Sequence, residues 1–255
     1  MKNLVFVYVF FSAAFAHSQD FRFLPDTMGT VLHKSGFILD FNESTALANW
    51  VAYELTIDEL DIKVASKRNY RKDSSVMHGY TKSDYSNFKV TGSDYDRGHL
   101  KPLRDSMSSQ DQRDDCNLMT NITPQYSSLN QKVWKYVEDK TRNLVTRKYP
   151  IYIITGPSPE FKEEIVGEWE WEVPIPQFYW KVIIQENDIA YSVIAFIMPN
   201  DISVKGKSES EYAFSIDELE RKVGIDFLQV LDDKVEVQLE SRDEFDWFLT
   251  KNPKR

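Results

Sequence analysis

Two segments of the chain limit most strongly what it can fold into. The first is the tetrapeptide Asp-Arg-Gly-His at positions 96–99, which gathers a carboxylate, a guanidinium and an imidazole around a glycine. A glycine here permits a backbone turn or a close approach that a side chain would block. The second is a helix-forming segment that carries Asn130, Glu138 and Arg142 at spacings of eight and four residues. We therefore expect a fold that brings the two segments to one site.

The periodicity of residues 129–144 predicts a helix. At about 100° per residue, its apolar residues form one stripe roughly 120° wide, and Asn130 projects into the middle of that stripe. Burying an unpaired amide costs about 1–3 kcal/mol, so Asn130 needs a partner. One role is a helix N-cap, and the other is a neutral oxygen ligand for a hard divalent cation. The stripe consists of Val133, Trp134, Val137, Thr141, Leu144 and Val145.

Glu138 and Arg142 lie about 80° and 120° around the same helix from Asn130, at the edge of the apolar stripe. They can line one flank of a site, Glu138 holding a water and Arg142 binding phosphate or stabilising its developing charge. An i,i+4 pair on the helix surface is the alternative. His99 is the natural general base, because imidazole titrates near neutral pH.

The charge is unevenly distributed. The net charge of −9 argues against tight non-specific binding of nucleic acid. Positions 63–104, however, hold ten Lys/Arg against four Asp/Glu, and positions 130–148 hold six against two. Positions 160–255 hold eleven against twenty-two, and we assign no chemistry to the acidic residues after Gly224. The basic run at 67–73 is a solvated loop or a phosphate clamp, with Arg68 the preferred member and Arg71 its competitor. This asymmetry suits an anionic substrate that is held locally.

Residues 1–16 have the pattern of a cleaved secretory signal, with Lys2 before an apolar run and an Ala-Phe-Ala ending. An uncleaved N-terminal anchor is the alternative. We expect residues 17–255 to form one secreted or periplasmic domain without further membrane segments. Cys116 is the single cysteine, which excludes a disulfide framework and a cysteine-based zinc site and indicates a small packing residue. His33 and His78 are expected at the surface.

The remaining elements form a scaffold. Residues 36–41 and 50–56 predict a hairpin, 151–156 a buried strand, and 178–184 with 190–198 a second hairpin. Residues 74–92 predict a loop. The sequence Ser-Ile-Asp-Glu at 215–218 is a capping box for a helix that stops at Gly224.

With these motifs together, the chain resembles the sugar-non-specific DNA/RNA endonuclease family of the ββα-metal superfamily over roughly residues 33–225. The resemblance rests on Asp-Arg-Gly-His-Leu-Lys-Pro at 96–102, Thr-Asn-Ile-Thr-Pro-Gln at 120–125, and Leu129-Asn130 followed by Trp134 and Glu138. The segments at 173–174 and 178–181 match more loosely. The chain departs from the family at Lys101, where alanine is common, which would place another cation beside the site.

The resemblance implies an α+β fold in which a central, mostly antiparallel sheet is flanked by helices and a hairpin-plus-helix element binds one Mg²⁺, with Mn²⁺ as an alternative. It implies His99 as general base, Asn130 as the direct metal ligand, Glu138 ordering a water bound to the metal, and Asn121 in the supporting shell. Arg68, Arg97 and Arg142 would contact phosphate or support the site.

The expected activity is hydrolysis of phosphodiester bonds in DNA and RNA, with homodimerisation left open. A phosphodiesterase for small nucleotides or other phosphate esters is the alternative, because the site chemistry does not require a polymer. A binding module that keeps the fold without turnover is a third reading, and such a module would be expected to lack the histidine or the asparagine.

Overall fold

The computed structural model describes residues 21–64, 69–81, 84, 94–166 and 173–249. The leader predicted at residues 1–16 and the candidate Arg68 lie outside these ranges. Within them, no helix combines the length and the apolar character that crossing a membrane requires.

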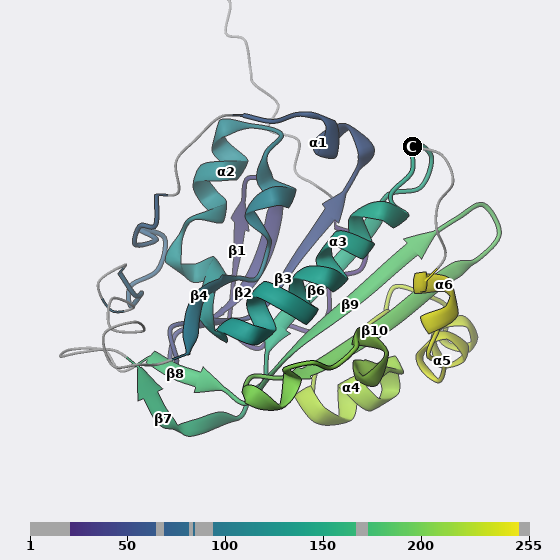
Figure 1. Ribbon diagram of the computed structural model, residues 1–255. Coiled ribbons are helices and arrows are strands. Elements are labelled where there is room, and N and C mark those ends of the chain that lie inside the picture. The colour runs from purple at the N-terminus through teal and green to yellow at the C-terminus, as the bar shows by residue number, and fades with distance from the viewer. Residues whose placement is uncertain (1–20, 65–68, 82–83, 85–93, 167–172, 250–255) are drawn as a thin grey trace, which may run out of the picture.

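A seven-stranded antiparallel sheet forms the centre of the molecule (Figure 1). The two predicted hairpins are confirmed, and the buried strand predicted at 151–156 pairs between them. Ser35 and Gly36 form the two-residue turn of a further hairpin, in which Gly36 takes a φ of 80° that favours glycine. The strand order is β1 (Thr30–Lys34), β2 (Phe37–Asn42), β3 (Leu47–Leu55), β6 (Ile151–Pro157), β9 (Phe178–Glu186), β10 (Tyr191–Pro199) and β11 (Ala213–Phe214).

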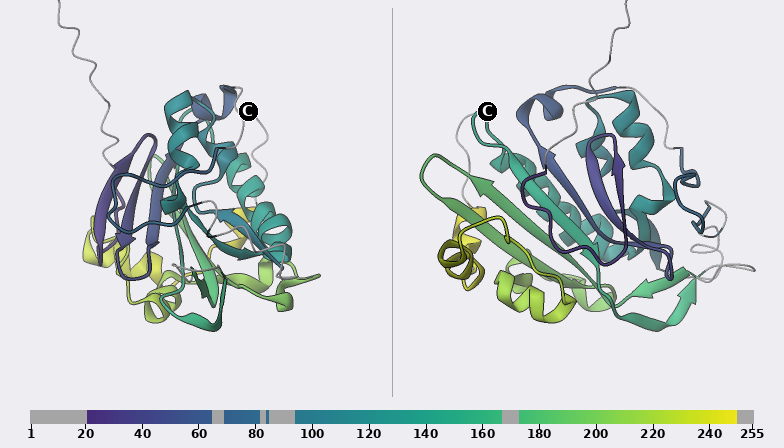
Figure 2. Two further views of the ribbon diagram at one scale, coloured as in Figure 1. Left: turned by 90° about the vertical axis from the view of Figure 1, so that its left-hand side faces the viewer. Right: turned by 180° about the vertical axis from the view of Figure 1, so that it is seen from behind.

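Helices cover the sheet on both faces. The edge-on view in Figure 2 places α2 (Gln110–Cys116) and α3 (Trp134–Leu144) on one side, and α4 (Ile216–Val223) and α5 (Asp233–Glu240) on the other. The central strands β9 and β10 are therefore buried along six consecutive residues each, which explains why their sequences are continuously apolar rather than alternating. The short helices α1 (Ile57–Asp61) and α6 (Phe245–Leu249) complete the helical layers.

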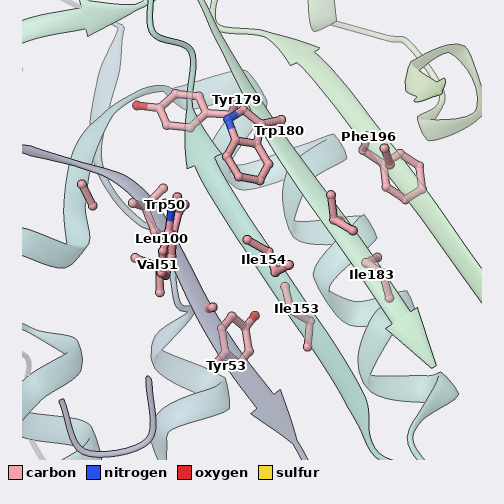
Figure 3. Close-up of a cluster of buried hydrophobic side chains, with 14 of the residues drawn as sticks. Trp50, Val51, Tyr53, Leu100, Ile153, Ile154, Tyr179, Trp180, Ile183 and Phe196 are labelled. Atoms are coloured by element: carbon pink, nitrogen blue, oxygen red, sulfur yellow. The ribbon is translucent and has the colours of Figure 1, made fainter. Parts of the chain in front are cut away.

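One connected cluster of buried apolar side chains runs through the described ranges. Figure 3 shows part of this cluster, with side chains from β3, β6 and β9 and with Leu100, the residue that follows the predicted histidine, beside Trp50 and Val51. Because Leu100 is completely buried, the backbone beside His99 is fixed to the core.

A separate ββα unit lies on the α3 side of the sheet. It consists of β4 (Tyr95–His99), β5 (Ile122–Tyr126) and the helix that ends with α3. The two strands are antiparallel, with His99 opposite Ile122 and Asp96 opposite Gln125. A third small sheet pairs β7 (Phe161–Val166) with β8 (Val173–Pro176). The mixed α/β fold with a large antiparallel sheet agrees with the sequence prediction.

The helix predicted at 129–144 forms, but its beginning differs from a regular α-helix. Leu129–Val133 is a π-helical turn that continues into α3. A π turn inserts about one extra residue, so the side chains before Trp134 are rotated relative to the wheel drawn from the sequence. The prediction that Asn130 lies in the middle of the apolar stripe is therefore wrong. The residue is half-buried. It is not the N-cap either, because Ser128 before it already has helical angles, φ −70° and ψ −28°.

The capping-box helix appears as predicted. The Ser215 side chain accepts from the Glu218 backbone N–H, and Gly224 ends α4 with a φ of 68°. His33 and His78 are exposed, as expected.

Candidate active site

A cavity of about 310 Å³ lies between β4, the segment after it and the helix of the ββα unit. It contains five of the seven residues selected from the sequence. Its walls are formed by Arg97, His99, Pro102, Leu103, Arg104, Asn130, Gln131, Lys135, Glu138, Asp139 and Arg142. Two segments that are distant in sequence therefore meet in one place.

His99 is the last residue of β4, and the packing beneath that strand is tight. The Gly98 position leaves no room for a side chain, because an added Cβ would lie 2.2 Å from the Gln125 side-chain oxygen. Gln125 on β5 is completely buried, and within the described residues its amide has no hydrogen-bond partner. The glycine of the motif thus allows β4 and β5 to pack closely against each other. This packing sets the position of His99, the last residue of β4, at the cavity.

Asn130 is oriented by Asp96. Its Nδ2 donates to Asp96 Oδ2 over 3.0 Å, and Gln131 Nε2 donates to the same oxygen over 2.7 Å. An ionised carboxylate only accepts hydrogen bonds, so the amide must present its nitrogen to Asp96 and its oxygen elsewhere. This leaves Asn130 Oδ1 as a neutral oxygen donor on a residue that lines the cavity, the type of atom that binds a hard divalent cation.

Arg142 lies beneath the cavity and is held by three carboxylates. It is only 3% exposed, its Nε donates to Asp105, its Nη1 donates to Asp139 over 2.8 Å, and its Nη2 donates to Glu138 over 3.5 Å. The i,i+4 pair considered from the sequence is therefore present. Because these carboxylates neutralise the guanidinium, its geometry favours a supporting role, and a direct phosphate contact remains a prediction.

Lys181 on β9 is a component of this buried charge network that sequence reasoning did not select. It is 1% exposed, within the described residues its ammonium has no hydrogen-bond acceptor, and it lies 4.6 Å from the centre of the Trp134 ring. Burial lowers the pKa of Lys181 to about 8, while the charge of Glu138 opposes that change. The sequence feature that could have identified Lys181 is that it is a single lysine within the apolar run of a central strand.

Glu138 receives opposing influences. Burial raises its pKa to about 7, and the positive charges of Lys181 and Arg142 act in the opposite direction. Its side chain is 13% exposed and lines the cavity. Glu138 is therefore a group whose charge changes near neutral pH, at a position from which it can accept a hydrogen bond from water in the cavity.

Arg97 is the cation best placed to meet an anion. Its guanidinium lies 5.0 Å from the centre of the Tyr70 ring, and Tyr70 also contacts His99, with 5.6 Å between ring centres. Among the described residues, no carboxylate forms an ion pair with Arg97. By contrast, Arg104 and Lys135, which also line the cavity, both pair with Asp139.

Asn121 supports the motif from below. It is completely buried, its Oδ1 accepts from the Lys101 backbone N–H over 2.8 Å, and its Nδ2 donates to the carbonyls of Lys101 and Cys116. These bonds fix the chain immediately after His99. This contact pattern is that of a structural support for the site.

Lys101 does not stand beside the site, contrary to the expectation from the sequence. Strand β4 ends at His99, and the chain then bends, so that Lys101 enters the core. Its Nζ donates to the Gly36 carbonyl over 2.6 Å and lies near the rings of Phe37 and Tyr53. Burial lowers the pKa of this ammonium group.

The surroundings of Cys116 and Arg71 argue against a direct role for either residue in the cavity. Cys116 is completely buried, and burial raises the pKa of its thiol to about 12, which disfavours a nucleophilic thiolate. Arg71 lies 3.7 Å from Asp115 and 4.0 Å from Asp114 and does not line the cavity.

The arrangement of the sheet and the ββα unit defines the fold class. A solved complex, described as the EndoG/EndoGI complex that shows the mechanism of EndoG inhibition, contains a chain that superimposes with a TM-score of 0.69 at 24% identity. The match covers 82% of this chain and 89% of the other. The two chains therefore share one fold, a large antiparallel sheet with a ββα unit beside it.

The family is established by the sequence comparisons. The model of the DNA/RNA non-specific endonucleases matches residues 21–234. A nuclease from Nostoc sp. is 31% identical over 87% of this chain and 80% of its own length, and a nuclease from Serratia marcescens is 31% identical over 82% and 79%. Human mitochondrial endonuclease G is 26% identical over 76% and 68%. The chain belongs to the DNA/RNA non-specific endonuclease family and is a nucleic-acid-hydrolysing enzyme.

Proposed function

We propose that the chain is a secreted, Mg²⁺-dependent endonuclease that cleaves both DNA and RNA, with His99 as the general base. The observation that carries this proposal is that His99, Asn130, Glu138 and Arg97 line one cavity. The apolar leader pattern at residues 1–16 supports export. Nucleases among the relatives support a polymeric substrate.

The side chains would divide the work as follows. His99 takes a proton from water, and the resulting hydroxide attacks phosphorus while the bond from phosphorus to the leaving 3'-oxygen breaks. Glu138, when ionised, accepts a hydrogen bond from water in the cavity and orients it. Arg97 contacts the phosphate from the Tyr70 side, and Arg142 with Lys181 sets the charge of Glu138 from beneath.

The donors in the cavity fit a hard divalent cation. Asn130, turned by Asp96, would hold the ion through Oδ1, with Glu138 nearby as the anionic group. When bound, Mg²⁺ would supply a positive charge that stabilises the phosphate and its leaving oxygen. Mn²⁺ has the same preference for oxygen ligands.

The decisive experiment is digestion of plasmid DNA, structured RNA and a dinucleotide by purified protein with added Mg²⁺. We expect cleavage of both polymers and its loss in EDTA. His99→Ala should reduce turnover by about 10²–10⁴-fold, and His33→Ala, at an exposed position on β1, is the matched control. Near-full activity of His99→Ala would reject the base assignment, and cleavage of the dinucleotide alone would favour a small-nucleotide phosphodiesterase.

Export is tested separately. Mass spectrometry of protein recovered from the culture medium or periplasm should find a mature N-terminus after residue 16. Recovery of the full-length chain from the cell membrane would instead support an N-terminal anchor.

A further inference from the structure

Five carboxylates gather between α4 and α5, the two helices that lie on the face of the sheet opposite α3 (Figure 2). They form two overlapping groups, and within each group the oxygens lie within 4.8 Å of one another. Glu240 belongs to both. The five residues, which we call the acidic cluster, are Asp217 and Glu220 of α4, Asp226 of the connecting segment, and Glu236 and Glu240 of α5.

Glu240 makes this cluster different from ordinary surface acid. The residue is only 7% exposed, and its Oε1 is shielded from solvent without a hydrogen-bond partner among the described residues. A buried carboxylate oxygen without a donor is costly. Because this carboxylate lies within 4.8 Å of the others, the buried oxygen belongs to a group that faces the cluster.

The cluster also lacks compensating positive charge. Within the described ranges, no lysine, arginine or histidine forms an ion pair with any of the five carboxylates. Burial, followed by the charges of Glu220 and Glu236, raises the pKa of Glu240 to about 8. Burial likewise raises the pKa of Glu220 and of Glu236. Repulsion of this kind is removed either by a proton or by a cation.

We propose that the acidic cluster is a Ca²⁺ site centred on Glu240, separate from the catalytic cavity. Ca²⁺ binds six to eight oxygens at about 2.3–2.6 Å, so oxygens on opposite sides of the ion are separated by roughly 4.6–5.2 Å. In each of the two groups, three carboxylates offer oxygens that lie within 4.8 Å of one another, close enough to share one ion. Mg²⁺ requires a smaller octahedron and retains several waters, so a set rich in carboxylates selects the larger ion.

The ion would connect three parts of the chain. Its ligands come from α4, from the segment after Gly224 and from both ends of α5. Both helices insert apolar residues into the core, Leu219 from α4 and Leu239 from α5. The site would therefore stabilise the packing of the C-terminal helices on the sheet, and its role would be structural.

Direct binding tests the proposal on the full chain carrying Asn130→Ala, which removes the proposed ligand in the cavity. Calorimetry should give about one Ca²⁺ per chain. A hundredfold excess of Ca²⁺ over Kd should raise Tm by roughly 5–10 °C relative to chelator. The absence of binding, or an equal gain in Tm with the same concentration of Mg²⁺, would overturn the assignment.

Glu240→Gln in the same background distinguishes a metal ligand from a buried acid. It should abolish both the binding heat and the gain in Tm. Asp226→Asn, at an exposed position, should weaken binding without endangering the fold, and Glu209→Gln, exposed and outside the cluster, should bind as the parent does. Unchanged Ca²⁺ binding by both cluster variants would refute the site. These readouts do not depend on turnover, so they fail or succeed independently of the proposed nuclease mechanism.

Discussion

Asn130 donates its amide hydrogen to Asp96 across the ββα unit, with 3.0 Å between Nδ2 and Oδ2. The contact joins the first residue of the Asp-Arg-Gly-His motif to the asparagine of the helix. It determines which end of the amide is available to a ligand, and it links the two sequence segments that define the site.

Asp96→Asn removes that control, because a second amide can donate as well as accept and permits Asn130 to rotate. Partners that orient a metal ligand typically contribute 10–100-fold to metal affinity. We expect the Mg²⁺ concentration for half-maximal cleavage to rise by about that factor, with most activity restored at saturating Mg²⁺. Asp94→Asn, which changes an exposed carboxylate bonded to Tyr126, is the matched control. Identical Mg²⁺ titrations for Asp96→Asn and the parent would contradict this role.

Glu138 should impose an acidic limb on the pH profile. Burial raises its pKa to about 7, and the ionised carboxylate is the better acceptor of a hydrogen bond from water, so activity should rise as pH increases through neutrality. Glu138→Gln should lower kcat and change the midpoint of that limb, since the general base His99 also contributes to it. The measurement is kcat between pH 5.5 and 9 at saturating Mg²⁺, and a limb with the same midpoint in Glu138→Gln and the parent would assign it to another group.

Lys181→Met should move the same limb. The positive charge of Lys181 lowers the pKa of Glu138, so its removal raises that pKa, shifts the limb to higher pH and reduces activity at pH 7 by roughly threefold to tenfold. A purely structural role would change stability and leave the limb in place. Lys101→Met, which removes a buried lysine that contacts the Gly36 carbonyl, should leave the limb unmoved.

Gly98→Ala should destabilise the ββα unit. The new Cβ would collide with the buried Gln125 side chain, and overpacking of this kind costs about 1–3 kcal/mol. Urea unfolding measures the loss. The double variant Gly98→Ala with Gln125→Ala should recover much of it, and a single variant as stable as the parent would show that the strands separate without cost.

Lys101→Met should have little effect on substrate choice. Since its ammonium faces the core, we expect an unchanged ratio of DNA to RNA cleavage. The free energy of unfolding should change by less than about 1.5 kcal/mol, because replacing a buried charge with a packed apolar group is often neutral. A changed DNA/RNA ratio would return Lys101 to the substrate site.

The regular scaffold was predictable because local sequence determines it. The apolar run of β6 and the capping box at Ser215 carry their own signals. The positions of His99 and Asn130 in one cavity followed from motifs read together. The secretory leader and the contribution of Arg68 remain predictions, since neither lies in the described ranges.

Other features depend on contacts that no local pattern encodes. Asp96 and Asn130 are 34 residues apart, and Lys181 meets Glu138 only because β9 passes beneath α3. Lys101 was misplaced because it was positioned only by its nearness to His99 in the motif, whereas β4 ends at His99 and Lys101 enters the core. The acidic cluster appeared featureless because its members are brought together by the packing of α5 beside α4.

The wide helical turn at Leu129–Val133 restricts how this site can be transferred to another protein. A designer who copies the helix onto a regular scaffold would rotate Asn130 by about one residue, or roughly 100°, relative to Glu138. The graft would contain every side chain of the original, but the Asn130 amide would point away from the cavity that Glu138 lines. Any transplanted version must therefore include the irregular backbone as well as the residues it carries.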